Sequence, residues 1–346
     1  MLDKSLRMNT ELLDKFSQRG RDFLGVRYPI ICGAMTWVST PELVAAVCNT
    51  GGFASIACGN MPLEVLEGQI ARTKELTDRP FAVNLITLAP AYTDHLKVAK
   101  KMKVPFIIFA GSFPKNPDVQ SAKESGAKVM CFASTHSIAM KMLEYGADGL
   151  ILEGMEAGGH VGHVTLNILL QQVLFKVSEV PVFVAGGIGT GKMCAHMFLM
   201  GASGVQMGTK FAVSTESCAH PQFKETFIKA KARDAVSTPQ FDSRLPVVAV
   251  RALRNQSTAE FGKLQLKLIG MLERGEIGRS EAQYKVEEFW VGRLRDAVID
   301  GDVSHGSLMS GQSVGLVNEI KPVAEIMEEI IGDAEAELVR VSGLFK

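Results

Sequence analysis

The sequence lacks the features that mark a secreted, membrane-spanning or metal-binding protein. No apolar run approaches the roughly 20 residues that a transmembrane helix needs. The stretch 1–21 mixes charges with isolated apolar residues and contains no apolar core of a secretory signal. The six cysteines include no Cys-x-x-Cys pair, which argues against a zinc ribbon or a local iron–sulfur motif. We therefore expect a cytoplasmic protein with reduced thiols, no bound metal and no membrane contact.

The chain also has no excess of charge of either sign. Its 37 basic and 37 acidic residues give a formal net charge of zero. Nothing in this composition indicates a polyanionic partner, so we expect no nucleic-acid binding. At 346 residues the chain is long enough for one large domain with an appended segment.

What the sequence does contain is a regular alternation of short apolar runs and amphipathic segments. Eight runs are mostly apolar without alternation, which is typical of strands that are buried on both faces of a parallel sheet. These predicted strands are 28–31, 53–57, 81–85, 106–110, 128–132, 149–153, 182–185 and 204–207. Between them the segments 41–49, 62–76, 137–145 and 192–200 predict helices. Thr40 and Ser137 are candidate N-caps of two of these helices.

Eight strands that alternate with helices predict an α/β fold, specifically a closed (β/α)8 TIM barrel. An open doubly wound sheet shows the same alternation, but here glycines cluster directly after the strands, where a barrel concentrates its chemistry. Residues 221–302 are richer in helix and charge, without strand runs of comparable strength, and predict an additional helical subdomain. We therefore divide the chain into a barrel (1–220), a helical lid or substrate subdomain (221–302) and a C-terminal segment that returns to the barrel (303–346).

The most informative loop follows the sixth predicted strand. Residues 153–163 contain four glycines, two glutamates and two histidines. Glycines let a backbone come close to a ligand, and a histidine in such a loop can donate a hydrogen bond or transfer a proton near neutral pH. Because His160 directly follows two glycines at a strand end, it is the candidate catalytic residue. His163 is interpreted as a solvated residue.

Two further glycine turns indicate a phosphate site. Residues 186–192 match the start of a P-loop, but Met193 stands where that motif needs a magnesium-binding hydroxyl. A phosphate that rests on backbone N–H groups at a helix N-terminus needs only glycines. A second turn at 207–209 follows the eighth strand, and the loops after strands seven and eight are the usual phosphate site of this fold. The two turns together predict a mononucleotide site.

These segments resemble the FMN-dependent family that contains nitronate monooxygenases (2-nitropropane dioxygenases) and flavin-type enoyl-acyl carrier protein reductases. The resemblance extends over residues 28–315. Its most specific segments are E-G-M-E-A-G-G-H-V-G at 153–162, A-G-G-I at 185–188 and V-Q-M-G-T-K-F at 205–211. Supporting segments are T-D-R-P-F-A-V-N at 77–84 and G-S-L-M-S-G-Q-S-V-G at 306–315.

The resemblance implies a noncovalently bound FMN and assigns the residues around it. The residues implied near the phosphate and the ribityl chain are Ala185, Gly186, Gly187, Gln206, Gly208 and Thr209. Those implied elsewhere in the cofactor site, mostly near the ring, are Gly33, Ala34, Met35, Asn84, Glu153 and Gly159. His160 matches the active-site histidine of the family.

Within the family the chain is more similar to the enoyl-acyl carrier protein reductases. The similar segments are 297–303 with 306–312, 37–38 and 216–224. This implies an FMN-dependent reductase of trans-2-enoyl thioesters in fatty acid synthesis, with NADH or NADPH as reductant. His160 would orient or polarise the thioester carbonyl, or assist protonation of the α-carbon, and segment 221–302 would help form an acyl or nicotinamide groove. The expected partners are an acyl-carrier-protein-bound or other small-molecule substrate and a second copy of the chain in a homodimer.

Three alternatives remain open at this stage. The first is a nitronate monooxygenase, in which His160 would be a general base and oxygen the oxidant. The second is an NAD(P)H:quinone reductase on the same scaffold, and the third is a flavin-binding accessory subunit without turnover.

Two departures from the family pattern concern the substrate end of the site. Cys32 stands where the family commonly has Gln, which we expect to place a thiol near the flavin. The loop 110–114 also differs from the glycine-rich loop of the reductases, and its Phe113 should add bulk at the barrel mouth. Three lysines near the mouth, at 224, 229 and 231, could steer an acidic carrier protein, although we interpret them as solvated surface residues.

Overall fold

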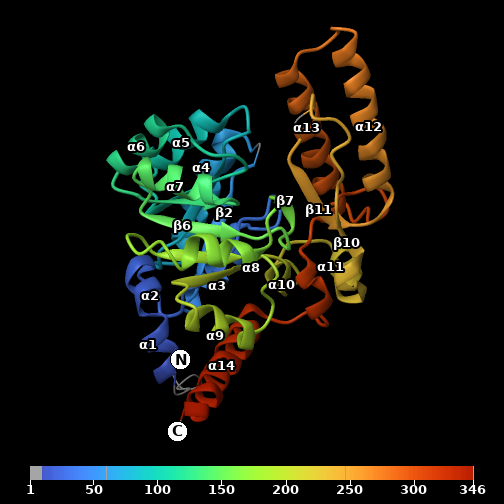
Figure 1. Ribbon diagram of the computed structural model, residues 1–346. Coiled ribbons are helices and arrows are strands. Elements are labelled where there is room, and N and C mark those ends of the chain that lie inside the picture. The colour runs from blue at the N-terminus through green and yellow to red at the C-terminus, as the bar shows by residue number, and fades with distance from the viewer. Residues whose placement is uncertain (1–9, 60, 246, 346) are drawn as a thin grey trace.

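Eight parallel strands close into a barrel, as the sequence predicts. The computed structural model describes residues 10–59, 61–245 and 247–345; residues 1–9 of the stretch 1–21 interpreted above lie outside them. The barrel order is β1-β2-β3-β4-β5-β6-β8-β9 (Figure 1). The barrel strands are β1 (Ile30–Cys32), β2 (Phe53–Ala57), β3 (Ala82–Ile86), β4 (Phe106–Ala110), β5 (Lys128–Ala133), β6 (Gly149–Glu153), β8 (Val182–Ala185) and β9 (Gly204–Met207). The predicted ranges of β2, β4, β6, β8 and β9 are confirmed without change, so the apolar runs alone located most of the barrel.

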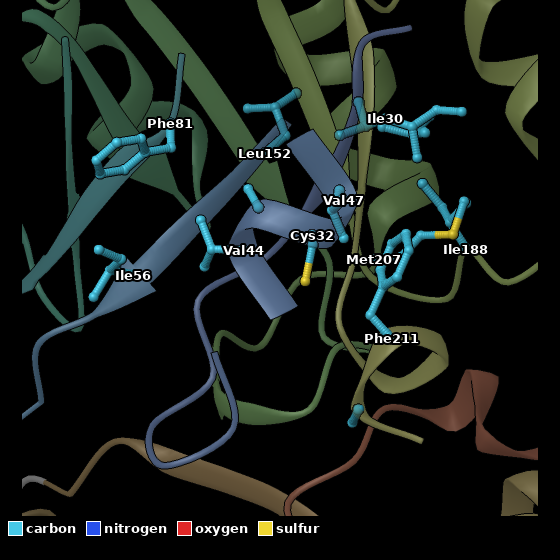
Figure 2. Close-up of a cluster of buried hydrophobic side chains, with 14 of the residues drawn as sticks. Ile30, Cys32, Val44, Val47, Ile56, Phe81, Leu152, Ile188, Met207 and Phe211 are labelled. Atoms are coloured by element: carbon cyan, nitrogen blue, oxygen red, sulfur yellow. The ribbon is translucent and has the colours of Figure 1, made fainter. Parts of the chain in front are cut away.

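Alternate residues of each strand fill two separate apolar layers. In β1, Ile31 packs inside the barrel with Phe53, Phe106 and other bulky side chains. Its neighbours Ile30 and Cys32 point the other way, into the layer between the barrel and the surrounding helices (Figure 2). Because successive side chains of a strand point to opposite faces, strands buried on both sides are apolar at most of their positions.

Helices cover the outside of the barrel. The helices that follow barrel strands are α3 (Pro41–Asn49), α4 (Leu63–Leu76), α5 (Tyr92–Lys101), α6 (Asn116–Glu124), α7 (His136–Glu144), α8 (Leu166–Leu169), α9 (Gly191–Leu199) and α10 (Thr209–Ala212). Helix α7 begins one residue earlier than predicted, because Thr135 is the cap: its side chain accepts a hydrogen bond from the N–H of Ile138 at 3.2 Å. Ser137 therefore lies inside the helix.

The two ends of the chain meet at the same side of the barrel. The N-terminal helices are α1 (Glu11–Phe16) and α2 (Gln18–Leu24), and the long C-terminal helix is α14 (Val323–Ser342). Helix α14 packs against α9, α1 and α3, and Figure 1 shows it close to α1 and α9. Helix α14 is amphipathic, with one buried face built from residues such as Ile326, Ile330 and Leu338.

The segment 221–302 is rich in helix as predicted, and it also contains two short strands that the sequence did not indicate. Strands β10 (Ala235–Ser237) and β11 (Ala249–Leu253) form an antiparallel sheet with β7 (Gly159–Val161), in the order β10-β11-β7. The run that forms β11 is interrupted by a charged residue, Arg251, which is 5% exposed and donates hydrogen bonds to the carbonyls of Met155 and Ala235. Because β7 belongs to the glycine-rich loop, this sheet fastens the subdomain to the barrel directly at His160, which pairs with Val250.

The rest of the subdomain is helical. Its helices are α11 (Pro221–Lys229), α12 (Gln256–Glu273) and α13 (Arg279–Val298). Helices α12 and α13 stand side by side and project away from the barrel (Figure 1), around a small core of their own that includes Phe261 and Trp290. Among the residues that the structure describes, no helix is both long and apolar enough to cross a membrane.

Candidate functional site

A cavity of about 480 Å³ lies at the carboxyl ends of the barrel strands, within the usual size range of small-molecule sites. All the residues that the sequence analysis assigned to the site line this one cavity. They are Gly33, Ala34, Met35, Asn84, Glu153, Gly159, His160, Ala185, Gly186, Gly187, Gln206, Gly208 and Thr209. The structure thus brings together residues from five strand ends, while their individual roles as flavin ligands stay predictions.

The turn after β8 is shaped by glycine. Gly186 has a φ of +98°, and a side chain there would place its Cβ 2.8 Å from the carbonyl oxygen of Gly154. The backbone of this turn can therefore approach a ligand closely, which suits a phosphate. Lys192 is exposed and is not among the residues that line the cavity, in agreement with the rejection of a P-loop.

A further wall of the cavity comes from the C-terminal segment. The N–H of Gly311 donates to Oγ1 of Thr209 at 3.0 Å, and the N–H of Gln312 donates to the carbonyl of Glu156 at 2.9 Å. Directly before these anchors, Ser310 lines the cavity with a buried hydroxyl that has no hydrogen-bond partner among the described residues. A buried hydroxyl without a partner is costly, so a polar ligand group at this point fits the site. Ser310 is not among the site residues predicted from the sequence, although it lies within the small-residue run 306–315.

His160 pairs with a carboxylate that the sequence analysis missed. Its Nε2 lies 3.2 Å from Oε1 of Glu287 on α13, and the two side chains are 23% and 16% exposed. Burial lowers the pKa of the His160 imidazole, but the charge of Glu287, the hydrogen bond to it and the charge of Glu153 raise it further, so the net pKa shift is upward. The pair therefore favours a protonated imidazole at the cavity. Glu287 is 127 positions away in the chain, and no local pattern marks it.

A second carboxyl group lies on the barrel side of the same site. Burial raises the pKa of Glu153 to about 8, and the nearby charge of His160 lowers it only in part. Near neutral pH this side chain is therefore largely a neutral acid, which can donate a hydrogen bond as well as accept one.

Two expectations about individual side chains are wrong. Cys32 is fully buried and does not line the cavity; it packs against α3 near Val44 and Val47 (Figure 2), since the alternation of β1 turns it outward. Burial holds the pKa of its thiol far above the usual range, so it is no thiolate nucleophile. Lys224 is 8% exposed and donates to the carbonyls of Ser214 and Ser217, both at 2.7 Å, which leaves it unable to steer a partner. Phe113, in contrast, lines the cavity and is half exposed, as expected at its mouth.

Comparison with known proteins identifies the family. The model of the nitronate monooxygenase family matches residues 17–102 and 86–333. The chain belongs to this family. It is therefore an oxidoreductase. Members of this family are flavin enzymes, and so are the FabK-type enoyl-acyl carrier protein reductases that this chain resembles in structure.

Three relatives show how far the similarity extends. The chain is 30% identical to a Rhodococcus jostii (3aS,4S,5R,7aS)-5-hydroxy-7a-methyl-1-oxo-octahydro-1H-indene-4-carboxyl-CoA dehydrogenase, over 90% of this chain and 94% of that protein. It is 27% identical to a probable nitronate monooxygenase of Staphylococcus aureus, over 89% and 94%. The structure of FabK from Thermotoga maritima superposes with a TM-score of 0.83 at 37% identity, covering 94% of this chain and 98% of that one. The family similarity thus includes the subdomain as well as the barrel.

Proposed function

We propose that this protein is an FMN-dependent enoyl-acyl carrier protein reductase, which uses NADH or NADPH to saturate trans-2-enoyl thioesters in fatty acid synthesis. The overall reaction consumes NAD(P)H, one proton and the enoyl thioester, and yields NAD(P)⁺ and the saturated thioester. The observation that carries the proposal is the pairing of His160 with Glu287 at the cavity. Saturation of the double bond needs a hydride at the β-carbon and a proton at the α-carbon, and a protonated imidazole can donate that proton.

The residues of the cavity fit a flavin phosphate. Gly186, Gly187, Gly208 and Thr209 would hold the phosphate, together with the unpaired hydroxyl of Ser310. When bound, FMN would supply the hydride transfer between the nicotinamide and the substrate. The chain's own contribution is to orient the two reactants, to exclude water and to present the proton on His160.

The thioester substrate is supported by two relatives that differ in reaction. FabK is an enoyl-acyl carrier protein reductase, and it shares 37% identity over nearly the full chain. The Rhodococcus jostii relative is named for a substrate that is a coenzyme A thioester. A thioester is therefore the chemical feature that the substrates of these two proteins have in common.

Nitronate monooxygenation is the second candidate, supported by the family model and by the Staphylococcus aureus relative. In that reaction His160 would act as a general base and would have to be neutral. Because the charge of Glu287 and its hydrogen bond to His160 favour the protonated imidazole, we rank the reductase first.

Anaerobic stopped-flow spectroscopy on the purified flavoprotein tests this proposal. NADH or NADPH should bleach the visible absorbance of the oxidised flavin, and a trans-2-enoyl thioester should restore it. His160→Gln should slow the second step by about 10²- to 10⁴-fold, the usual range for a lost proton donor. The matched control His136→Gln, at an exposed position outside the cavity, should leave both steps unchanged. Bleaching by a nitronate but by neither nicotinamide would move the assignment to the monooxygenase.

A further inference from the structure

A second, smaller cavity of about 60 Å³ lies beside His160, between the barrel and the subdomain. It adjoins the main cavity, and five residues line both. These shared residues are Thr36, Ile86, His160, Leu294 and Met309. We call this smaller cavity the side branch.

One face of α13 forms a wall of the side branch. Glu287, Trp290, Val291 and Leu294 are spaced i, i+3, i+4 and i+7, which places them on a single face of the helix. Glu287 is engaged by His160, and the other three side chains are apolar or aromatic. This face thus carries its charge at the His160 end and is apolar further along.

The opposite wall comes from the loop after β3. Leu88 and Ala89 of this loop line the side branch, and Ala89 is only 8% exposed. Trp290 on α13 is 1% exposed, so each of the two walls includes a buried apolar side chain. Water is held poorly in such surroundings, and an apolar ligand group gains by entering them.

We propose that the side branch binds the apolar tail of the substrate, an unbranched aliphatic chain whose reactive end lies at His160. This inference rests on the proposed function for the thioester at that reactive end. The branch holds about four to six water-sized groups, since each occupies about 10–15 Å³ of such volume. A tail of similar length, in carbon atoms, would fill it.

One buried polar group favours a different ligand, a tail that carries an oxygen atom. The indole N–H of Trp290 is buried and has no acceptor among the described residues. A tail that carries an oxygen atom would be preferred if this N–H faced into the branch. The binding experiment therefore includes an acyl thioester with an ether oxygen in its tail.

Binding of saturated acyl-coenzyme A thioesters to the oxidised holoenzyme tests the proposal without any turnover. The chain has two tryptophans, so Trp37→Phe leaves Trp290 as the sole indole reporter. From butyryl to longer chains, Kd should fall about fourfold per added methylene until the branch is full, and then level off. Acyl chains with a terminal bromine should quench Trp290 fluorescence most at the length where Kd levels off.

Two variants on opposite walls give independent checks. Val291→Phe on α13 and Ala89→Leu on the loop should each abolish the gain per methylene while butyryl thioester binds as before. Leu266→Phe, at a position of α12 that is 62% exposed, is the matched control and should keep the full chain-length dependence. A Kd independent of chain length, or tighter binding of a chain with an ether oxygen, would overturn the assignment of an apolar tail.

The outcome also separates this inference from the proposed function. Length-dependent binding without reoxidation of the flavin by enoyl thioesters would retain the side branch as a tail site and reject the reductase. Reoxidation by enoyl thioesters at rates and affinities that ignore chain length would retain the reductase and reject the tail site.

Discussion

The carboxylate of Glu287 decides the protonation state of the histidine at the cavity. In Glu287→Gln the charge that raises the pKa of His160 is gone, whereas the burial that lowers this pKa remains. The pKa of His160 should therefore fall, and the population of protonated imidazole should be lost at a lower pH than in the wild type. Titration of the histidine ring by NMR measures this directly, and the alkaline limb of the pH profile of substrate reduction should move to lower pH with it.

Glu288→Gln is the matched control for this change, because Glu288 is exposed on the same helix. It removes the same charge from α13 without touching His160, and it should leave the titration where it was. An equal shift in both variants would mean that the field of the helix as a whole, and not the contact at 3.2 Å, sets the pKa.

Glu153 should make the protein less stable as the pH rises. Burial raises its pKa in the folded protein to about 8 from an ordinary value of 4.5. Between these two values the unfolded chain is ionised while the folded protein still binds the proton, so stability falls with rising pH over this window. The isosteric variant Glu153→Gln keeps a donor and an acceptor but cannot ionise. Its Tm should exceed that of the wild type at pH 8, on the order of a few degrees, and match it near pH 4.5.

At the scale of the elements, the local hydrophobic pattern predicted the helices and strands whose burial follows from their own sequence. The eight barrel strands are mostly apolar runs because both of their faces are buried, and this signal gives the strand boundaries to within two residues. Strand β11 escaped notice because its buried Arg251 is satisfied by carbonyls from Met155 and Ala235, distant in sequence. The same reason explains why Glu287 was not predicted from the sequence. Its contact with His160 spans 127 positions, so it depends on where α13 is placed and not on any local motif.

Two glycine-to-alanine changes should have opposite effects on stability, because only one of the two glycines lies against another loop. A Cβ at Gly158 would lie 2.4 Å from the backbone carbon of Ser310, so Gly158→Ala must push the C-terminal segment away from the cavity. We expect a loss of about 1–3 kcal/mol of stability and weaker binding of FMN. Gly68 lies inside α4 with nothing within 4 Å of its Cβ, and Gly68→Ala should instead stabilise the protein by about 0.5–1 kcal/mol.

Thermal unfolding and equilibrium dialysis with FMN measure both effects. Unchanged FMN affinity in Gly158→Ala would show that the segment around Ser310 can move without disturbing the cofactor site. That result would remove Ser310 from the set of residues that hold the phosphate.

At the scale of the whole molecule, closure of the barrel positions most residues of the site, and the subdomain supplies the others. The predicted flavin-site residues come from turns whose positions follow from barrel closure, and this is why the sequence could assign them. The subdomain contributes Glu287 and the wall of the side branch, and neither could be assigned without knowing that β7, β10 and β11 form one sheet. The boundaries at 220 and 302 and the homodimer stay predictions, and sedimentation velocity tests the latter.

The proposed flavin site predicts that the whole protein depends on FMN for part of its stability. A ligand that binds only the folded state stabilises it by about 2.7 kcal/mol at a concentration of 100 times Kd, so Tm should rise steadily with the logarithm of FMN concentration. Riboflavin has the same ring but lacks the phosphate that the turns at Gly186 and Gly208 would bind. At equal concentration it should therefore raise Tm less than FMN, as measured by calorimetry on protein stripped of flavin. Equal shifts from the two flavins would place the binding energy on the ring and contradict a phosphate site at these turns, whereas no shift from either would contradict the flavin site itself.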